Sequence, residues 1–279
     1  MTTAIAACAG RDPPPAVAAA PPDLSLIVAM AHGADLAQFH EVLGAYRGAM
    51  RWEIVTAGTQ AIGTAGVFRQ WRAGLDHARG RYLAILDARC PPQAGWPAAV
   101  AAAIATQQPV FFGPVICEAS AADACMVGYL SEYVQFLPPI DAANREVPGN
   151  NVIFTRDLVD DAVRSLPEFH KTFFIERVRA AGVPVARLDA AVVRYLKHYA
   201  FGHYLRRRHA HGRQYAALRV GRFVRARLLL TPLLPLLRLR RLWAATRAKP
   251  AARAALLRHF VPVLLSEICL LYTSPSPRD

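Results

Sequence analysis

A short apolar run between two chain breakers constrains the fold of this chain more than any other feature. Residues 82–86 read YLAIL, follow Gly80, and precede Asp87 and a Pro-Pro pair. An apolar run of this length with breakers at both ends predicts a strand that is buried on both faces. The chain therefore carries a carboxylate and a guanidinium, Asp87 and Arg89, to the carboxyl end of a central strand. Ligands bind at that end of the strands in open α/β sheets.

Strand and helix patterns alternate through most of the chain. Apolar runs predict further strands at 24–30, 52–56, 109–117 (interrupted at Gly113-Pro114), 152–154 and 183–188. Helical spacing predicts helices at 35–45, 67–77, 95–106, 121–137, 171–181 and 199–220. This alternation predicts an α/β fold with a mostly parallel sheet and helices on both faces.

Several motifs in this order and at these distances resemble family-2 glycosyltransferases of GT-A fold. Residues 79–95 (RGRYLAILDARCPPQAG) resemble the strand and Asp-x-Asp turn of that family. Residues 146–159 (EVPGNNVIFTRDLV) resemble its acceptor-side motif, and residues 170–182 and 195–219 resemble the two helices that follow. The resemblance covers about residues 24–219 and is closest to bacterial members. It implies a transferase that uses a nucleotide-diphosphate sugar and inverts the configuration at the anomeric carbon of that sugar.

The resemblance also implies a donor site, which departs from the family here. An acid that usually contacts the base is replaced by Ala57 and Gly58, so base recognition falls to backbone groups or to Asp35. Asp87 is kept and is expected to bind ribose or metal. Arg89 replaces the acid that normally ligates Mn²⁺ or Mg²⁺. We predict that Arg89 pairs the donor diphosphate bidentately and weakens the need for a metal; the alternative is an arginine on a solvated loop.

The proton acceptor for sugar transfer is expected near the start of the helix after the acceptor motif. Glu168 is the first candidate and His170 the second, since either group can accept a proton from a hydroxyl. Lys171 stands where close relatives often carry an acid. Alternatively, Glu168 is an acid at a helix N-terminus, where the helix macrodipole favours it, and His170 is an ordinary surface histidine.

The same resemblance implies two further contact groups. Gly149, Asn150 and Asn151 are candidates for acceptor binding, because glycine permits close approach and amides suit sugar hydroxyls. A plain turn before a strand is the alternative. Among the basic residues at 197–213, His198 and Arg206 are the candidates for diphosphate contact, while the rest of this cluster is expected to be a solvated or membrane-facing surface.

Charge is distributed unevenly along the chain. Residues 1–189 carry 15 Arg and Lys against 18 Asp and Glu, whereas residues 190–279 carry 18 basic residues and only two acids. The C-terminal third therefore predicts contact with a polyanion. Residues 221–267 interleave leucines with arginines and contain no apolar run of spanning length, which favours helices lying on an anionic membrane surface. Nucleic acid is disfavoured because few stacking aromatics accompany the arginines.

Four segments are expected along the chain. Residues 1–22 form an Ala/Pro-rich disordered tail without signal-peptide character, 23–220 the GT-A domain, and 221–267 the membrane-associating helices. Residues 268–279 resemble a translated sequencing adaptor and are excluded from the fold. The five cysteines show no paired spacing, which favours free thiols in a reducing compartment. Together with the C-terminal helices, this predicts a cytoplasmic protein attached peripherally to the inner face of the membrane.

The sequence thus predicts a glycosyltransferase that uses a UDP- or GDP-linked sugar and a lipid-linked or cell-envelope glycan acceptor. A catalytically degenerate glycosyltransferase-like binding protein is the alternative, because several donor-site positions depart from the family. A basic nucleic-acid-binding protein is a third interpretation, which binding to RNA in preference to anionic vesicles would support.

Overall fold

The centre of the molecule is a six-stranded sheet in the order β2-β1-β3-β6-β4-β7. The computed structural model describes residues 20–30, 34–56, 64–118, 123–218 and 233–271. β6 runs antiparallel to both of its neighbours, and the other pairings are parallel. The predicted mostly parallel sheet is therefore confirmed. The strands are β1 (Leu24–Ala29), β2 (Trp52–Val55), β3 (Tyr82–Asp87), β4 (Val110–Phe112), β6 (Asn151–Thr155) and β7 (Val185–Arg187).

The apolar run that dominates the sequence is the inner strand β3, and all six of its residues are buried. It pairs with β1 on one side and β6 on the other. The register places Asp87 beside Ala29 and Leu86 beside Asn151. The carboxyl end of β3 and the amino end of β6, which belongs to the segment resembling the acceptor-side motif, therefore lie side by side.

The predicted strand at 109–117 is two strands in separate sheets. β4 stays in the large sheet, whereas β5 (Val115–Ile116) pairs with β8 (Val193–Arg194) in a small parallel sheet. The chain changes sheets at Gly113, where an added Cβ would lie 1.7 Å from the carbonyl oxygen of Ala191. Only glycine permits so close an approach of two backbone segments.

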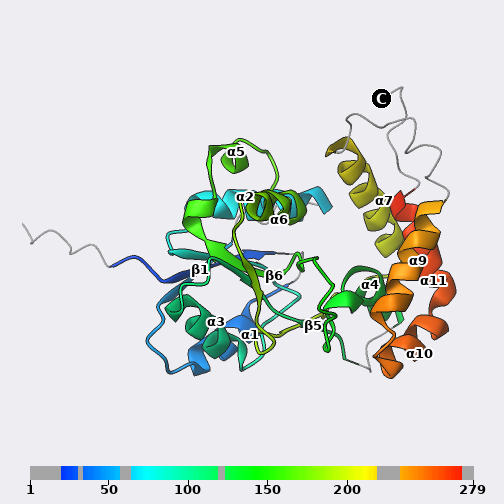
Figure 1. Cartoon of the computed structure of the whole chain (residues 1–279), viewed down its shortest axis with the longest axis horizontal. Helices are drawn as coiled ribbons and strands as arrows, with labels where there is room; N and C mark the ends of the chain where they lie inside the picture. Colours follow the sequence, from blue (N-terminus) through cyan, green and yellow to red (C-terminus); the bar gives the residue numbers. More distant parts are fainter. Residues whose placement is uncertain (1–19, 31–33, 57–63, 119–122, 219–232, 272–279) are drawn as a thin grey trace, which may run out of the picture.

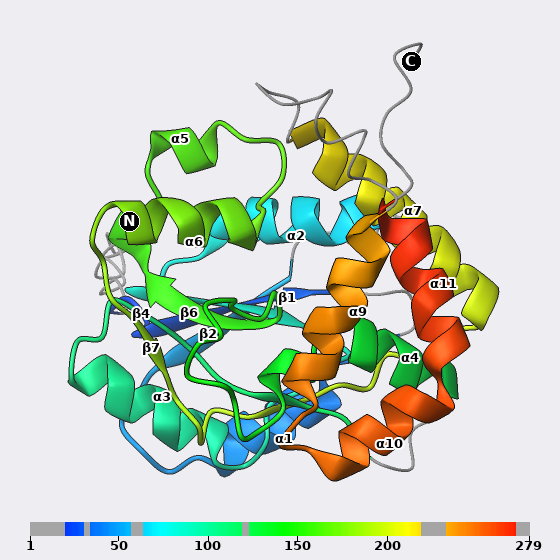
Figure 2. The ribbon, with the colours of Figure 1, turned by 45° about the vertical axis from the view of Figure 1, so that its right-hand side comes forward.

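Helices cover both faces of the large sheet, as predicted. α2 (Thr64–His77) and α6 (Lys171–Ala180) lie over one face, and α1 (Ala37–Ala45) and α3 (Trp96–Ala105) lie over the other (Figure 1, Figure 2). Each of these helices presents an apolar stripe to the core, as Phe174, Ile175 and Val178 do in α6. Short helical turns complete this part of the chain: η1 (Val134–Phe136), η2 (Arg156–Leu158) and α5 (Asp161–Arg164).

A second group of helices packs beside the sheet (Figure 1). It consists of α4 (Asp123–Glu132), α7 (Phe201–Leu218), α9 (Leu234–Ala245), α10 (Pro250–Arg258) and α11 (Phe260–Leu271). Their buried side chains form a separate hydrophobic cluster that includes Leu130, Tyr204, Leu242 and Val263. The C-terminal helices therefore pack on helices from the predicted catalytic region rather than forming an isolated tail.

A buried carboxylate joins these helices. Glu267 of α11 is fully buried and lies 2.9 Å from Arg208 of α7 and 3.1 Å from Arg238 of α9. A buried charge of this kind is tolerated only when it is paired. The ion pairs thus hold α7, α9 and α11 in one arrangement.

The predicted segment boundaries fall partly outside the described residues. Residues 1–19, the boundary at 220 and residues 272–279 lie outside them. Residues 20–22 contact the amino-terminal end of β3, where the backbone carbonyl of Pro22 accepts a hydrogen bond from the backbone N–H of Arg81. α11 continues to Leu271, so the first residues of the segment 268–279 are helical. Within the described ranges, no helix has both the length and the apolar content needed to cross a membrane.

Candidate functional site

The site is organised around Asp87, whose side chain is 1% exposed at the carboxyl end of β3. Nε and Nη2 of Arg89 each lie 3.1 Å from its carboxylate oxygens, and Nζ of Lys197 lies 2.9 Å away. Burial alone would raise the pKa of Asp87, but the charges of Lys197 and Arg89 and their hydrogen bonds hold it well below its usual value. Asp87 is therefore ionised and fully engaged.

Arg89 uses all three guanidinium nitrogens inside the protein. Besides its two bonds to Asp87, its Nη1 donates to the hydroxyl of Tyr199 at 2.6 Å. The side chain is 15% exposed. The alternative of an arginine on a solvated loop is therefore wrong. The two guanidinium nitrogens predicted to pair the diphosphate, Nε and Nη2, are instead bonded to Asp87.

The burial of Lys197 differs from the prediction. Its position in the basic cluster at 197–213 predicts an exposed side chain, yet Lys197 lies in the segment before α7 and its side chain is 7% exposed. Its ammonium group lies over the rings of Tyr133 and Tyr195, 5.5 and 5.6 Å from their centroids. Burial would lower the pKa of Lys197, but Asp87 raises it well above its ordinary value. Asp87, Arg89 and Lys197, hereafter the charged trio, thus carry a net charge of about +1.

The two candidate proton acceptors lie together at the start of α6. Nε2 of His170 is 3.0 Å from Oε2 of Glu168, and Nε of Arg69 donates to Oε1 of Glu168 at 3.3 Å. His170 is buried against the ring of Phe68, with centroids 4.5 Å apart. Burial lowers the pKa of His170, although Glu168 opposes this effect. A neutral ring that donates from Nε2 to Glu168 keeps its lone pair on Nδ1.

Two of the acceptor-side candidates, Asn150 and Asn151, are fully buried but differ in their hydrogen bonding. The amide of Asn151 is used within the protein: Oδ1 accepts from Trp96, and Nδ2 donates to the carbonyl oxygens of Pro114 and Ala191. Asn150 is buried beside the weakly bonding thiol of Cys90, and its amide has no other polar partner in the described part of the chain. Asn151 therefore has a structural role, whereas Asn150 keeps its bonding capacity.

Trp71 of α2 lies between these groups. Its Nε1 donates to the carbonyl oxygen of Leu86 at 2.7 Å, next to Asp87. An added Cβ at Gly149 would lie 3.9 Å from its ring, and Phe68 packs against it edge to face with centroids 5.7 Å apart. One indole thus connects the charged trio, the acceptor-side glycine and the Phe68–His170 contact.

Three of the remaining predicted residues are exposed rather than buried with the charged trio. Asp35 is exposed and accepts a hydrogen bond from the backbone of Ala37 at the start of α1. His198 and Arg206 are exposed. Ala57 and Gly58 lie outside the described residues.

No protein-family model matches the sequence, and no curated protein matches it either. Among solved structures, it is similar to the mannosyltransferase PcManGT from Pyrobaculum calidifontis in complex with GDP-Man and Mn²⁺, at 15% identity and a TM-score of 0.51. The match covers 94% of this chain and 89% of that one. The chain has the GT-A fold. A similarity to S. aureus TarS in complex with UDP-GlcNAc has a TM-score of 0.37 at 12% identity and covers 67% of this chain and 65% of that one.

The GT-A fold raises the question whether a divalent cation fits the charged trio. Mn²⁺ and Mg²⁺ prefer several oxygen ligands. Here both oxygens of Asp87 are already bonded to cationic groups, and Arg89 occupies the position of the expected second acid. Among the described residues, no three His, Cys, Asp or Glu side chains are grouped so as to hold a metal ion. These residues do not fit a divalent cation.

Proposed function

We propose that this chain is a glycosyltransferase that moves a sugar from a UDP- or GDP-linked donor to a lipid-linked or cell-envelope glycan. The observation that carries the proposal is the charged trio at the carboxyl end of β3 within a GT-A fold. A buried cluster with net positive charge suits a diphosphate, which must be neutralised as it leaves. In this proposal fixed cations take the electrostatic role that a metal ion has in other enzymes.

In the proposed reaction His170 is the general base and Glu168 is the positioning residue. Glu168 accepts the Nε2 proton of His170, so Nδ1 is the nitrogen able to take the proton of the acceptor hydroxyl. Nδ1 has no hydrogen-bond partner within the described residues. The hydroxyl oxygen then attacks the anomeric carbon from the side opposite the diphosphate. The sugar–phosphate bond breaks, and the nucleoside diphosphate carries away its electron pair.

Gly149 and Asn150 are proposed to contact the acceptor. Both precede β6, whose first residue pairs with Leu86 next to Asp87. The unsatisfied amide of Asn150 supplies the hydrogen-bonding capacity that a sugar hydroxyl requires. An unpaired buried amide costs free energy, which a bound hydroxyl would recover.

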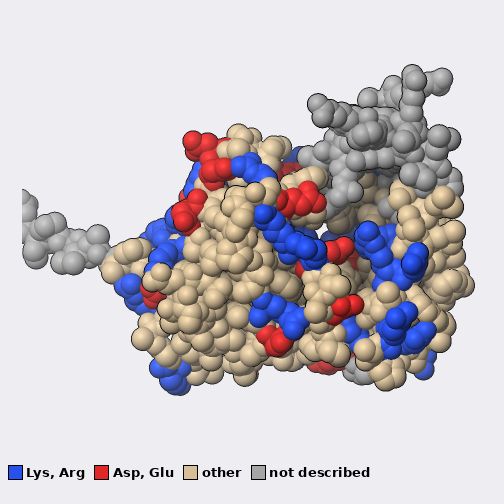
Figure 3. Space-filling view, viewed as in Figure 1, with Lys and Arg blue, Asp and Glu red and all other residues tan. Residues whose placement is uncertain are grey.

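The C-terminal helices support attachment to an anionic membrane, which would place the enzyme at the cytoplasmic face of the membrane. Exposed apolar side chains include Leu236, Leu237, Trp243, Phe260 and Val261. Lys and Arg side chains form patches on the face of α9 and α10 seen in Figure 3. Apolar groups with flanking cations fit the interface of an anionic bilayer, where each nearby basic residue contributes about 1 kcal/mol.

Turnover of a sugar donor tests the proposed activity. The full-length chain is incubated with UDP- and GDP-sugars, and release of free nucleoside diphosphate is measured with and without membrane lipid extract. The proposal expects release that requires His170 and is lost in His170→Ala. Binding of a nucleotide without any release or transfer would instead support the degenerate binding protein, which the replacement of the usual acids by Arg89 and Lys171 favours.

A further inference from the structure

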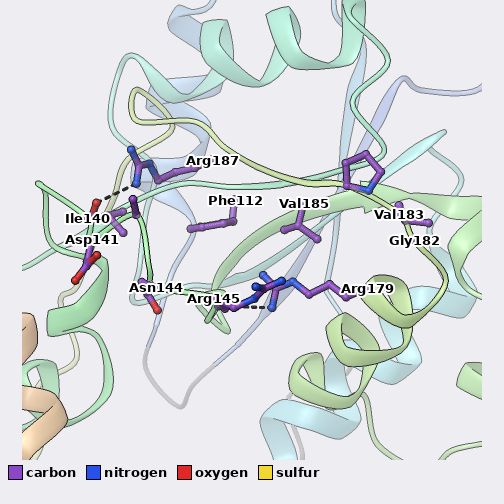
Figure 4. A pocket seen from close by; sticks show the side chains of 12 residues that line it. Phe112, Ile140, Asp141, Asn144, Arg145, Arg179, Gly182, Val183, Val185 and Arg187 are labelled. Atoms are coloured by element: carbon purple, nitrogen blue, oxygen red, sulfur yellow. Dashed lines mark hydrogen bonds between the residues drawn. The ribbon is translucent and has the colours of Figure 1, made fainter.

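A separate hollow of about 400 Å³ opens at the far edge of the sheet. Its floor is formed by Phe112 of β4 and Val185 of β7, and its walls are the loop 140–145 and the end of α6 (Figure 4). A volume of this size is typical of pockets for small ligands. None of the candidate donor, base or acceptor residues lines it.

The pocket is strongly basic. Arg145, Arg179 and Arg187 line it, against one acid, Asp141. Figure 4 shows Arg145 and Arg179 side by side on one wall and Arg187 on the other, with Phe112 and Val185 between them. The Asp141 carboxylate accepts a hydrogen bond from the backbone of Ala143 at 2.8 Å.

Two of these arginines are held close together without a counter-charge. Nη1 of Arg179 donates to the carbonyl oxygen of Arg145, which brings the two side chains to the same wall. Burial and the positive charge of Arg145 lower the pKa of Arg179. Within the described chain, neither side chain forms an ion pair with Asp or Glu, whereas Arg187 is paired with Asp189 at 2.9 Å. An anion between Arg145 and Arg179 would relieve their repulsion.

We infer that this pocket binds an oxyanion, a phosphate or a carboxylate, carried by the acceptor glycan. The inference rests on the proposed function and names the class of its acceptor. β3, β4 and β7 run in the same direction, so their carboxyl ends, which carry Asp87, Phe112 and Arg187, lie on the same side of the sheet. The pocket extends from this side along β7 to Gly182, Val183 and Pro184, just before its first residue. Three strand spacings, roughly 14 Å, separate β3 from β7. The loop that walls the pocket continues into Gly149 and Asn150.

This geometry fits an acceptor that extends beyond its reacting hydroxyl. The hydroxyl would lie beside Asn150 and His170, while an anionic group further along the acceptor would lie between the arginines. Guanidinium forks match both phosphate and carboxylate oxygens, so the shared chemistry is an oxyanion. The pocket would thus select anionic acceptors over neutral ones.

The test uses the full-length chain with two probes, inorganic phosphate and glucuronate, titrated by calorimetry at low ionic strength with saturating UDP or GDP. We expect at least one probe to bind, and Arg145→Ala to weaken it about tenfold or more, since a charge-assisted hydrogen bond is lost. Arg145 is exposed, so this change should not unfold the protein. Arg177→Ala, on the same helix as Arg179 but paired with Asp160, should bind the probe as the unaltered chain does.

The outcomes separate this inference from the proposed function. If neither probe binds, or if Arg145→Ala and the double variant Arg145→Ala/Arg179→Gln bind as tightly as the unaltered chain, the inference is overturned. If the unaltered chain binds neither UDP nor GDP, the result would count against the glycosyltransferase proposal alone, because nucleotide binding does not involve this pocket. Phosphate binding without glucuronate binding would identify a phosphate-bearing acceptor, and the reverse would identify a uronic acid.

Discussion

The ammonium group of Lys197 lies 2.9 Å from the carboxylate of Asp87. This contact joins the end of β3 to the segment that leads into α7, and it places a second cation on a carboxylate that Arg89 already binds. Because both partners are buried, neither is screened by solvent. The electrostatic character of the site therefore depends on this pair.

Replacing Lys197 by Met should destabilise the fold and weaken nucleotide binding. The change leaves buried Asp87 with Arg89 alone, and breaking a buried ion pair costs about 3 kcal/mol. Urea unfolding followed by tryptophan fluorescence measures the loss, and Lys197→Arg should restore part of it. An unfolding free energy equal to that of the unaltered chain would show that the pair does not form in solution.

The same variant should change the response to acid. The pKa of Asp87 is depressed in the folded state, so its contribution to stability is present above the unfolded pKa of about 4 and is lost as the pH falls toward the folded value. Without Lys197 the pKa of Asp87 in the folded state rises toward its unfolded value, so less stability depends on the ionisation of Asp87. Between pH 7 and pH 3, through pH 5, the unfolding free energy should therefore fall less for Lys197→Met than for the unaltered chain.

The rate of sugar transfer should fall on the acid side as His170 becomes protonated. Burial places the pKa of His170 below 6.5, so the rate should stay level at pH 7 and fall only below its lowered pKa. Glu168→Gln removes the negative charge that raises this pKa, so the fall should move to lower pH. His211 and Arg69 also face this region, across Phe68 and at Glu168 respectively. An acid limb that does not move in Glu168→Gln would contradict the assignment.

Glu267 should be essential to the packing of the C-terminal helices. Glu267→Gln removes the buried counter-charge of Arg208 and Arg238, with Glu132 still 3.8 Å from Arg208, and should cost about 3 kcal/mol. Glu146→Gln provides the matched control, because its partner Arg241 lies 3.9 Å away at the surface and such pairs contribute little. Equal midpoints of urea unfolding for the two variants would argue against the ion-paired arrangement.

Attachment to membranes should depend on exposed apolar residues of α9. Leu237→Glu removes the transfer free energy of one leucine, about 2 kcal/mol, and adds a charge that anionic lipids repel. Sedimentation with vesicles containing anionic phospholipid should show binding at least about tenfold weaker. Leu166→Glu, an equally simple change at an exposed leucine near α6, should bind vesicles as before. Stronger binding of the unaltered chain to RNA than to vesicles at physiological salt would favour a nucleic-acid partner instead.

The sequence predicts the inner strands of the sheet well because they are almost entirely buried. The apolar run at 82–86 predicts a buried inner strand, as β3 is, and local apolar patterns likewise predict β1 and α3. Gly113 and Pro114 predict the interruption of the fourth strand. That the chain changes sheets there depends on the backbone of Ala191, which no local pattern predicts.

The site is predicted less completely because its pairings join distant segments. Asp87 and Arg89 are recognisable from the strand that carries them, and Glu168 and His170 from the helix start. The burial of Lys197 depends on Tyr133, Tyr195 and Asp87, which come from three separate parts of the chain. Likewise, Asn151 is typical of a ligand-binding turn, and only the contacts with Trp96, Pro114 and Ala191 indicate its structural role.

Neutralisation of the diphosphate by the charged trio is tested by calorimetric binding of UDP and GDP to the full-length chain, first with EDTA and then with Mn²⁺. Because fixed cations are proposed to neutralise the diphosphate, one nucleotide should bind in EDTA, gain little from Mn²⁺, and bind at least about tenfold more weakly to Arg89→Ala and Lys197→Met. Circular dichroism would verify that both variants remain folded. Binding that appears only with Mn²⁺, or that both folded variants retain in full, would contradict this role of the charged trio.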